Sequence, residues 1–266
     1  MAGDLLIRNS AMVIGGGIVH GDLRVVAGKI ASIARGGGLE PHGGETVIEG
    51  EGLHLLPGAI DPQVHFREPG QSEKEDLGSG SRAAAAGGVT AFLDMPNNVP
   101  AATTMEAMQS KLESAARSAV THHGFFIGAT PNNVTDLQQA VGTPDAPSST
   151  AGICGIKVFM GSSTGDLLVH QQQHLEDIFA GTAGIIAVHF YLGEKLEVGV
   201  VFRCREFENF FVGARLLCTE LVTWESQYPE IVMLTLQSTQ TCVLRSEASL
   251  TGKIDNQECL IAIVRK

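Results

Sequence analysis

The stretch Asp61-Pro62-Gln63-Val64-His65-Phe66-Arg67-Glu68-Pro69-Gly70 is the part of the sequence that decides the fold and points to its chemistry. Side chains of a strand alternate between its two faces, so positions 63 and 65 are predicted to share a face, with Arg67 following as the strand enters a loop. Imidazole is a good metal ligand and guanidinium matches a carboxylate, whereas the amide of Gln63 is a weak metal ligand. The stretch therefore predicts a metal ion and an anion held at the end of one strand.

Outward from this stretch, apolar strands alternate with helices. Strands are predicted at 55–60, 89–95, 124–129, 153–160 and 184–189, and helices at 75–86, 104–119, 134–141 and 170–180. Strands that alternate with helices of this length form a parallel sheet with right-handed crossovers. Both a (β/α)8 barrel and an open doubly wound sheet satisfy this pattern.

Polar side chains at successive strand ends favour the barrel. They are His65 and Arg67, Asn97 and Asn98, Asn132 and Asn133, Lys157, and His189. The active sites of barrels are built at such strand ends. A doubly wound sheet would place a glycine-rich phosphate loop after its first strand, and Gly-x-Gly-x-x-Gly is absent there. We therefore predict an α/β fold with a (β/α)8 TIM-type barrel, which is incomplete or distorted if its C-terminal part departs from the pattern.

The chain changes in character along its length, and this change predicts three parts. Residues 1–55 alternate short apolar runs with glycine-rich turns, which indicates a small β subdomain. Residues 56–189 hold the first five βα units of the barrel. Residues 190–266 form an atypical segment without histidine and with only four of the 32 glycines, but with four of the five cysteines. Its apolar runs at 198–202, 231–236 and 259–264 could be strands that complete or replace the rest of the barrel.

Composition limits the partners of the chain. With 266 residues, 44% of them hydrophobic and 18% charged, the chain is predicted to be globular. A net charge of −11 without a basic cluster argues against a nucleic-acid partner. No apolar run approaches a membrane span, and the N-terminus does not resemble a signal peptide. The five cysteines form no CxxC pair and are interpreted as reduced thiols. These features predict a cytoplasmic protein whose partners are small molecules or proteins.

Three blocks of this sequence resemble motifs of the dihydroorotase branch of the amidohydrolase superfamily. They are residues 57–70, the stretch Asp94-Met95-Pro96-Asn97-Asn98, and residues 157–165, and they occur in the order of the family. The resemblance covers about residues 1–189. It implies a metal-dependent hydrolase that opens or closes a cyclic amide, with a small β domain beside a TIM-type barrel.

The resemblance also implies roles for single residues. His65, His189 and a carboxylated Lys157 would bind one or two zinc ions, with Gln63 as a weak further ligand, while Arg67 and Asn97 would hold the carboxylate of a substrate. A lysine reacts with carbon dioxide only as the free amine, so Lys157 needs surroundings that lower its pKa. Outside this context the same residues have ordinary interpretations, namely a core or surface histidine, a solvated lysine at a strand end, and loop residues with local hydrogen bonds.

The sequence departs from the family pattern in two places. Gln63 replaces the first histidine of the family's His-x-His pair, and no histidine follows His189, where the family has a further metal ligand. Asp255 is the only aspartate beyond that point, and it is a weak candidate for the family's catalytic aspartate. Two function classes therefore stay open. One is a dihydroorotase-like hydrolase of pyrimidine biosynthesis acting on dihydroorotate, with allantoinase and hydantoinase as rivals. The other is an inactive structural or regulatory subunit, in a homo-oligomer or bound to an aspartate transcarbamoylase-like partner.

Overall fold

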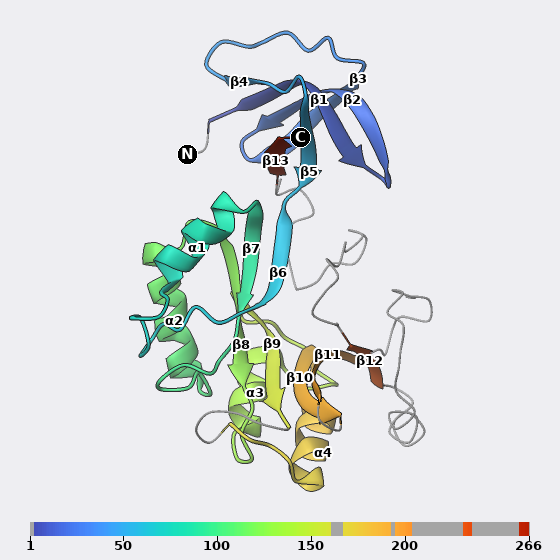
Figure 1. The fold of residues 1–266 in the computed structure, drawn as a ribbon. Coiled ribbons are helices and arrows are strands. Elements are labelled where there is room, and N and C mark those ends of the chain that lie inside the picture. Colours follow the sequence, from blue (N-terminus) through green and yellow to red (C-terminus); the bar gives the residue numbers. More distant parts are fainter. Residues whose placement is uncertain (1–2, 161–166, 193–194, 204–230, 236–260, 266) are drawn as a thin grey trace.

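Two β-sheets organise the chain, which we describe from a computed structural model for residues 3–160, 167–192, 195–203, 231–235 and 261–265 (Figure 1). The first sheet has the strand order β13-β5-β1-β2-β3, with β4 also paired to β1. Its strands are β1 (Leu5–Ile14), β2 (Gly17–Val26), β3 (Lys29–Arg35), β4 (Thr46–Glu49), β5 (Leu53–Pro57) and β13 (Ile261–Arg265). Five of its six strands come from the N-terminal part of the chain, and the sixth, β13, comes from near its C-terminal end.

The second sheet carries the predicted alternation of strands and helices. Its parallel strands β6 to β10 lie side by side in chain order, and helices α1 to α4 connect them. Their bounds are β6 (Ala59–Val64), α1 (Leu77–Ala86), β7 (Val89–Asp94), α2 (Met105–Ser118), β8 (His122–Gly128), α3 (Val134–Val141), β9 (Ile153–Phe159), α4 (Gln172–Gly181) and β10 (Ile185–Leu192). The arrangement is a partial TIM-type barrel, as predicted.

The regular repeat ends after β10. The next strand, β11 (Lys195–Arg203), pairs antiparallel with β10, and β12 (Ile231–Thr235) pairs antiparallel with β11. The last strand, β13, returns to the first sheet and pairs antiparallel with β5. Each of the three apolar runs singled out in the C-terminal segment thus overlaps a strand. In the second sheet, the antiparallel strands β11 and β12 stand where a complete barrel would have its next βα unit.

The predicted strand at 55–60 was wrong in one respect, because it is two strands. The chain passes from the first sheet to the second at Gly58, between β5 and β6. A Cβ atom at Gly58 would lie 2.0 Å from the Thr90 hydroxyl oxygen, so a side chain there would clash with β7. This approach requires glycine at the point where the chain changes sheet, and an apolar run in the sequence does not reveal it.

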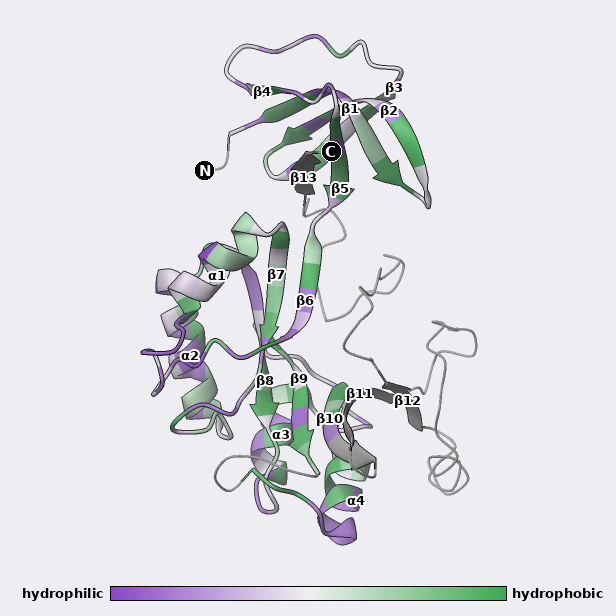
Figure 2. Cartoon of the chain, viewed as in Figure 1, coloured by the Kyte–Doolittle hydropathy of each residue, from purple (hydrophilic) through white to green (hydrophobic). Residues whose placement is uncertain are grey.

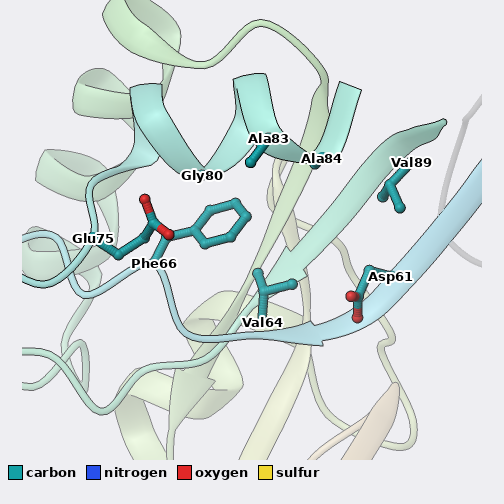
Figure 3. Close-up of a pocket in the computed structure, with 8 residues that line it drawn as sticks. All are labelled: Asp61, Val64, Phe66, Glu75, Gly80, Ala83, Ala84 and Val89. Atoms are coloured by element: carbon teal, nitrogen blue, oxygen red, sulfur yellow. The ribbon is translucent and has the colours of Figure 1, made fainter. Parts of the chain in front are cut away.

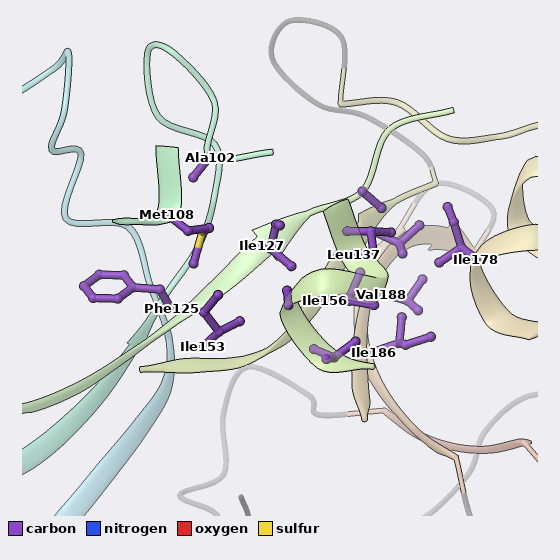
Figure 4. Close-up of a cluster of buried hydrophobic side chains, with 14 of the residues drawn as sticks. Ala102, Met108, Phe125, Ile127, Leu137, Ile153, Ile156, Ile178, Ile186 and Val188 are labelled. Atoms are coloured by element: carbon purple, nitrogen blue, oxygen red, sulfur yellow. The ribbon is translucent and has the colours of Figure 1, made fainter. Parts of the chain in front are cut away.

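The main hydrophobic core lies between the second sheet and its helices (Figure 4). Strand residues such as Phe125 and Ile156 are fully buried against helix residues such as Met108 and Leu137. Burial of each such side chain contributes about 1.5–3 kcal/mol. Figure 2 shows hydrophobic colouring along β8 and β9, with hydrophilic colouring on parts of α2 and α4. A second, smaller hydrophobic cluster lies on the other face of the strands and is formed by Met95, Phe126 and Ala187.

Two further sequence-based expectations can be compared with the described residues. None of the described helices combines the length and the apolarity that crossing a membrane requires. Cys154 is a free, partly buried thiol, as expected, and the other four cysteines lie outside the described residues.

Candidate functional site

His65 and Asn97 meet where β6 and β7 end. His65 follows β6 directly and Asn97 lies three residues beyond β7, and the His65 Nδ1 atom is 2.6 Å from the Asn97 side-chain oxygen. The amide oxygen can only accept, so Nδ1 carries the proton and Nε2 keeps its lone pair. Burial lowers the pKa of His65, and the nearby charges of Arg67 and Lys157 lower it further, against the opposing effects of Asn97 and Asp94. At neutral pH His65 is therefore an uncharged imidazole, the form that can bind a metal ion.

The two loops that carry these residues, 65–70 and 95–99, are joined by further contacts, and we call them together the loop clasp. The Asn98 side-chain nitrogen donates to the Glu68 carbonyl oxygen at 2.9 Å, and the Val99 backbone N–H donates to the Pro69 carbonyl oxygen at 3.2 Å. Gly70 has φ 92°, and a Cβ atom there would lie 1.9 Å from the Val99 carbonyl oxygen. The close approach of the loops therefore requires glycine at position 70.

Helices α1 and α2 form hydrogen bonds with the first loop of the loop clasp. Asp76 forms a capping box with Ser79 at the start of α1, and the Glu68 carboxylate accepts a hydrogen bond from the Leu77 backbone N–H at 3.0 Å. The second oxygen of that carboxylate is bonded by the Ser114 hydroxyl of α2. Glu68 therefore connects the first loop to two helices at once.

Arg67 lies between these anchored residues in an unusual backbone conformation. Its φ is 58°, in the left-handed region that residues other than glycine rarely adopt. Its side chain is partly exposed, and no described residue forms a hydrogen bond or an ion pair with the guanidinium. The predicted anion-binding group is thus held by its backbone and not by a side-chain partner.

A buried ion pair beneath the clasp was missed by the sequence analysis. The Lys111 Nζ atom of α2 lies 2.8 Å from a carboxylate oxygen of Asp94, and the side chains are 1% and 0% exposed. A signal was available, because Lys111 falls on the helical stripe formed by Met108 and Ala115, the two other buried residues of α2. A lysine at a core position of an amphipathic helix predicts a buried partner.

Lys157 points away from the main core, to the inner face of the barrel. Its neighbours in β9, Ile156 and Val158, are in the core beneath the helices, so alternation places Lys157 on the opposite face. It is fully buried, and no described residue forms a hydrogen bond with its Nζ atom, which lies 5.3 Å from the centre of the Phe159 ring. Burial lowers the pKa of Lys157 to about 8. A free amine is thus accessible near neutral pH, as the predicted carboxylation requires.

His189 shares this inner face. It is paired with Phe159 in the register of β9 and β10, and the two ring centres are 5.5 Å apart. Its Nε2 atom is buried without a hydrogen-bond partner among the described residues. Burial lowers the pKa of His189, and the charges of Lys157 and His65 lower it further. The register of β9 and β10, in which Lys157 is paired with Ala187, therefore places Lys157 and His189 on the same face of adjacent strands.

Other predicted positions are not part of this group. Asn133 donates from its side chain to the carbonyl oxygens of Thr103 and Gly128, both at 2.8 Å, so it has a structural role. Asn132 is exposed. Gln63 lies in β6 and is partly buried, and Asp255 lies outside the described residues. His122 is the first residue of β8, two residues before the predicted start of this strand.

By the types of their donor atoms, the residues at this site are suited to a metal ion with three protein ligands. The described residues contain no group of three or more His, Cys, Asp or Glu side chains placed to hold a metal ion. Lysine is not among those four types, however, and the buried Lys157 Nζ and His189 Nε2 atoms have no other described partner. Catalytic zinc sites use three protein ligands and keep one position open. His65, His189 and a carboxylated Lys157 would supply that number.

The hollow seen in Figure 3 lies elsewhere, between β6 and α1. It is lined by mainly apolar groups, including Val64, Ala83 and the ring of Phe66, which lies against Gly80. Val64 and Phe66 pack against the core beneath the helices, whereas Lys157 is on the inner face. This hollow is therefore on the opposite side of the sheet from the candidate site.

Comparisons with known proteins give a partial family match. A model of the Dihydro-orotase-like family matches residues 52–146, which include the whole loop clasp. The match confirms a partial resemblance of the chain to the dihydroorotase branch of the amidohydrolases.

Individual relatives belong to several kinds of cyclic amide hydrolase. An allantoinase of Solibacter usitatus is 35% identical over 161 residues, which are 60% of this chain and 33% of that protein. A dihydroorotase of Methanosarcina acetivorans is 31% identical over 170 residues, 64% of this chain and 34% of that protein. The solved structure of an L-hydantoinase from Arthrobacter aurescens has 25% identity and a TM-score of 0.59, and the match covers 71% of this chain and 41% of that one. This chain thus spans about a third to two fifths of the proteins that it resembles.

Proposed function

We propose that the chain carries the metal-binding part of a cyclic amide hydrolase site, built on the partial barrel. The observation that carries this proposal is that Lys157 and His189 share the inner face of β9 and β10 and have buried polar atoms without a described hydrogen-bond partner. His65 follows β6 in the same sheet. Buried polar groups are normally paired, so such atoms mark a place for a ligand. The resemblance of residues 52–146 to dihydroorotases supplies the chemical class.

The zinc site would be assembled by three residues of this chain. His65 would offer Nε2, because Asn97 holds its Nδ1 proton, and His189 would offer its buried Nε2 atom. The free amine of Lys157 would form a C–N bond to carbon dioxide and release a proton, which leaves an anionic carbamate with oxygen ligands. When bound, a zinc ion supplies Lewis-acid chemistry, since it lowers the pKa of water to about 7 and polarises a carbonyl group.

The substrate would be a cyclic amide with a carboxylate, and dihydroorotate is our first choice. Arg67 offers a planar fork that matches a carboxylate, and Asn97 keeps its two N–H donors because only its oxygen faces His65. This choice would place the chain in pyrimidine biosynthesis. The allantoinase and hydantoinase relatives make allantoin and hydantoins the rival substrates.

A second candidate function is that of a catalytically inactive relative that acts as a structural or regulatory subunit. The glutamine at position 63 favours it, since it replaces the first histidine of the family's His-x-His pair. An aspartate transcarbamoylase-like partner, a homo-oligomer and a cytoplasmic location belong to this part of the proposal. So does the division into residues 1–55, 56–189 and 190–266, supported by the change of sheet at Gly58.

Metal content and turnover together test the proposal. The full chain would be purified with zinc and bicarbonate present, its zinc content measured, and hydrolysis followed with dihydroorotate, allantoin and hydantoin, with His65→Ala as the control. We expect bound zinc in the wild type and its loss in the variant. Bound zinc without turnover would favour the inactive subunit. A folded wild-type chain that binds no zinc and hydrolyses none of the three compounds would overturn the metal site.

A further inference from the structure

Lys111 contacts the second loop of the loop clasp and the end of β7 that precedes it. It projects from the buried stripe of α2, and its Nζ atom contacts three acceptors. These are the Met95 carbonyl oxygen at 2.8 Å, the Asn98 side-chain oxygen at 2.6 Å and the Asp94 carboxylate at 2.8 Å. The first two contacts are hydrogen bonds and the third is an ion pair. All three acceptors lie in one stretch of chain, from the last residue of β7 into the second loop.

Two of these acceptors are bonded in turn to the first loop. The other carboxylate oxygen of Asp94 accepts a hydrogen bond from the Phe66 backbone N–H at 3.0 Å. The Asn98 side-chain nitrogen donates to the Glu68 carbonyl oxygen. Phe66 and Glu68 flank Arg67, and Phe66 follows His65. Lys111 therefore ties the backbone on both sides of the predicted anion-binding residue to the loop that carries Asn97.

Stability alone is a poor explanation for a charged group at this position. Burial lowers the pKa of Lys111 against the opposing effect of Asp94, which reflects the cost of taking an ammonium group out of water. Replacement of a buried ion pair by apolar residues is often neutral or stabilising. A compact ammonium head can meet three acceptors from different directions, which an apolar side chain cannot do.

We propose that Lys111 is a positioning residue that sets the orientation of His65 and Asn97 through the loop clasp. Its bonds to Met95 and Asn98 fix the loop on either side of Asn97, and Asn97 in turn holds the Nδ1 proton of His65. His65 thereby presents Nε2 to the site. The inference rests on the proposed function, because there His65 is a metal ligand.

The double variant Asp94→Asn/Lys111→Met tests this role in the full chain. It removes both charges together, so no buried charge is left alone, and the new amide still offers an oxygen to the Phe66 N–H. Leu137→Ala is the control. Leu137 lies on α3 and is fully buried in the main core, so its replacement would lower stability without removing a contact of the loop clasp. Nitrogen NMR of the His65 ring, assigned by its loss in His65→Gln, reports which ring nitrogen carries the proton. Competition with a chromogenic chelator reports zinc affinity.

We expect the wild type and Leu137→Ala to keep the proton of His65 on Nδ1. In the double variant the two tautomers should mix and zinc affinity should fall about 10–100-fold, as is typical when a residue that orients a ligand is lost. If a folded double variant keeps both the tautomer and the affinity, the inference is wrong. If the tautomer changes but neither protein binds zinc, the positioning role stands and the proposed metal site fails.

A second variant covers the case in which the double variant does not fold. Asn98→Ala removes one acceptor of Lys111 and the link to the Glu68 carbonyl oxygen, but it keeps the ion pair. A partial shift of the His65 tautomer is expected from it. An unchanged tautomer in this variant would count against the inference.

Discussion

The two sides of the candidate site differ in how their polar groups are satisfied. At the ends of β6 and β7, His65 and Asn97 are hydrogen-bonded to each other, and the Lys111–Asp94 pair is bonded to the loops that carry them. On β9 and β10, the Lys157 Nζ and His189 Nε2 atoms are buried without a described hydrogen-bond partner. The first side is therefore a rigid support, and the second carries free donor atoms at a cost in stability. Such a division suits a site in which His65 is held in place in advance, while Lys157 and His189 stay free to bind.

The largest effect is expected from breaking the first side at Gly70. Gly70→Ala would force a side chain into a left-handed backbone conformation and against the Val99 carbonyl oxygen. Strain and overpacking together should lower the free energy of unfolding by roughly 3–5 kcal/mol. Urea denaturation followed by circular dichroism measures this change.

Gly17→Ala is the matched control for that experiment. Gly17 begins β2, and no atom lies within 4 Å of the place that its Cβ would take. We expect a change of less than about 0.5 kcal/mol from it. Equal effects of the two substitutions would show that the two loops are not close enough at Gly70 to exclude a side chain.

At Lys157, on the second side, a substitution is expected to raise the free energy of unfolding. Lys157→Met removes a buried charge that has no described partner, so in metal-free and bicarbonate-free buffer at pH 7 the variant should be more stable by about 2–3 kcal/mol. The pKa of this lysine is about 8 in the folded chain, against 10.5 for an ordinary lysine. Between these values the unfolded chain binds more protons. Wild-type stability therefore rises with pH in this window, and the advantage of the variant shrinks.

Thermal and urea unfolding between pH 7 and pH 10 would follow this change. Lys74→Met serves as the control, since Lys74 is exposed and its loss should change stability by less than about 0.5 kcal/mol at any of these pH values. A Lys157→Met variant that is less stable than the wild type at pH 7 would mean that the Lys157 ammonium group is satisfied in the folded chain.

The sequence predicted the helices and strands of the barrel well because their periodicity is a local property. Helix α2 was expected at 104–119 and is Met105–Ser118, and both ends of α3 agree. The direction of β11 could not be predicted, since an apolar run at 198–202 indicates a strand but not its partner. The same holds for the division at Gly58, which depends on Thr90 of another strand.

The candidate site was predictable to a different degree on its two sides. The pairing of His65 with Asn97 agrees with their predicted places at neighbouring strand ends. Lys157 and His189 were expected at strand ends and lie within β9 and β10, on the inner face, and their roles rest on the family resemblance. Lys111 was missed because its partner Asp94 is on another element, and a charge on a helical stripe does not name the group that it meets.

The smallest effect is expected at His189, where it depends on pH. His189→Phe removes a buried ring nitrogen without a described partner and keeps a ring against Phe159, so at pH 7.5 it should stabilise the chain by about 0.5–1 kcal/mol. Burial and the neighbouring charges lower the pKa of His189 from its usual 6.5. Below pH 6.5 the unfolded chain therefore binds more protons than the folded one, and wild-type stability falls as the pH falls. The variant lacks this loss, so its advantage should grow from pH 7 to pH 5 in urea titrations, while the exposed control His170→Phe should show no such trend. An advantage that stays constant over this range would mean that the pKa of His189 is the same in the folded and the unfolded chain. The His189 ring would then be as accessible to water as a surface residue.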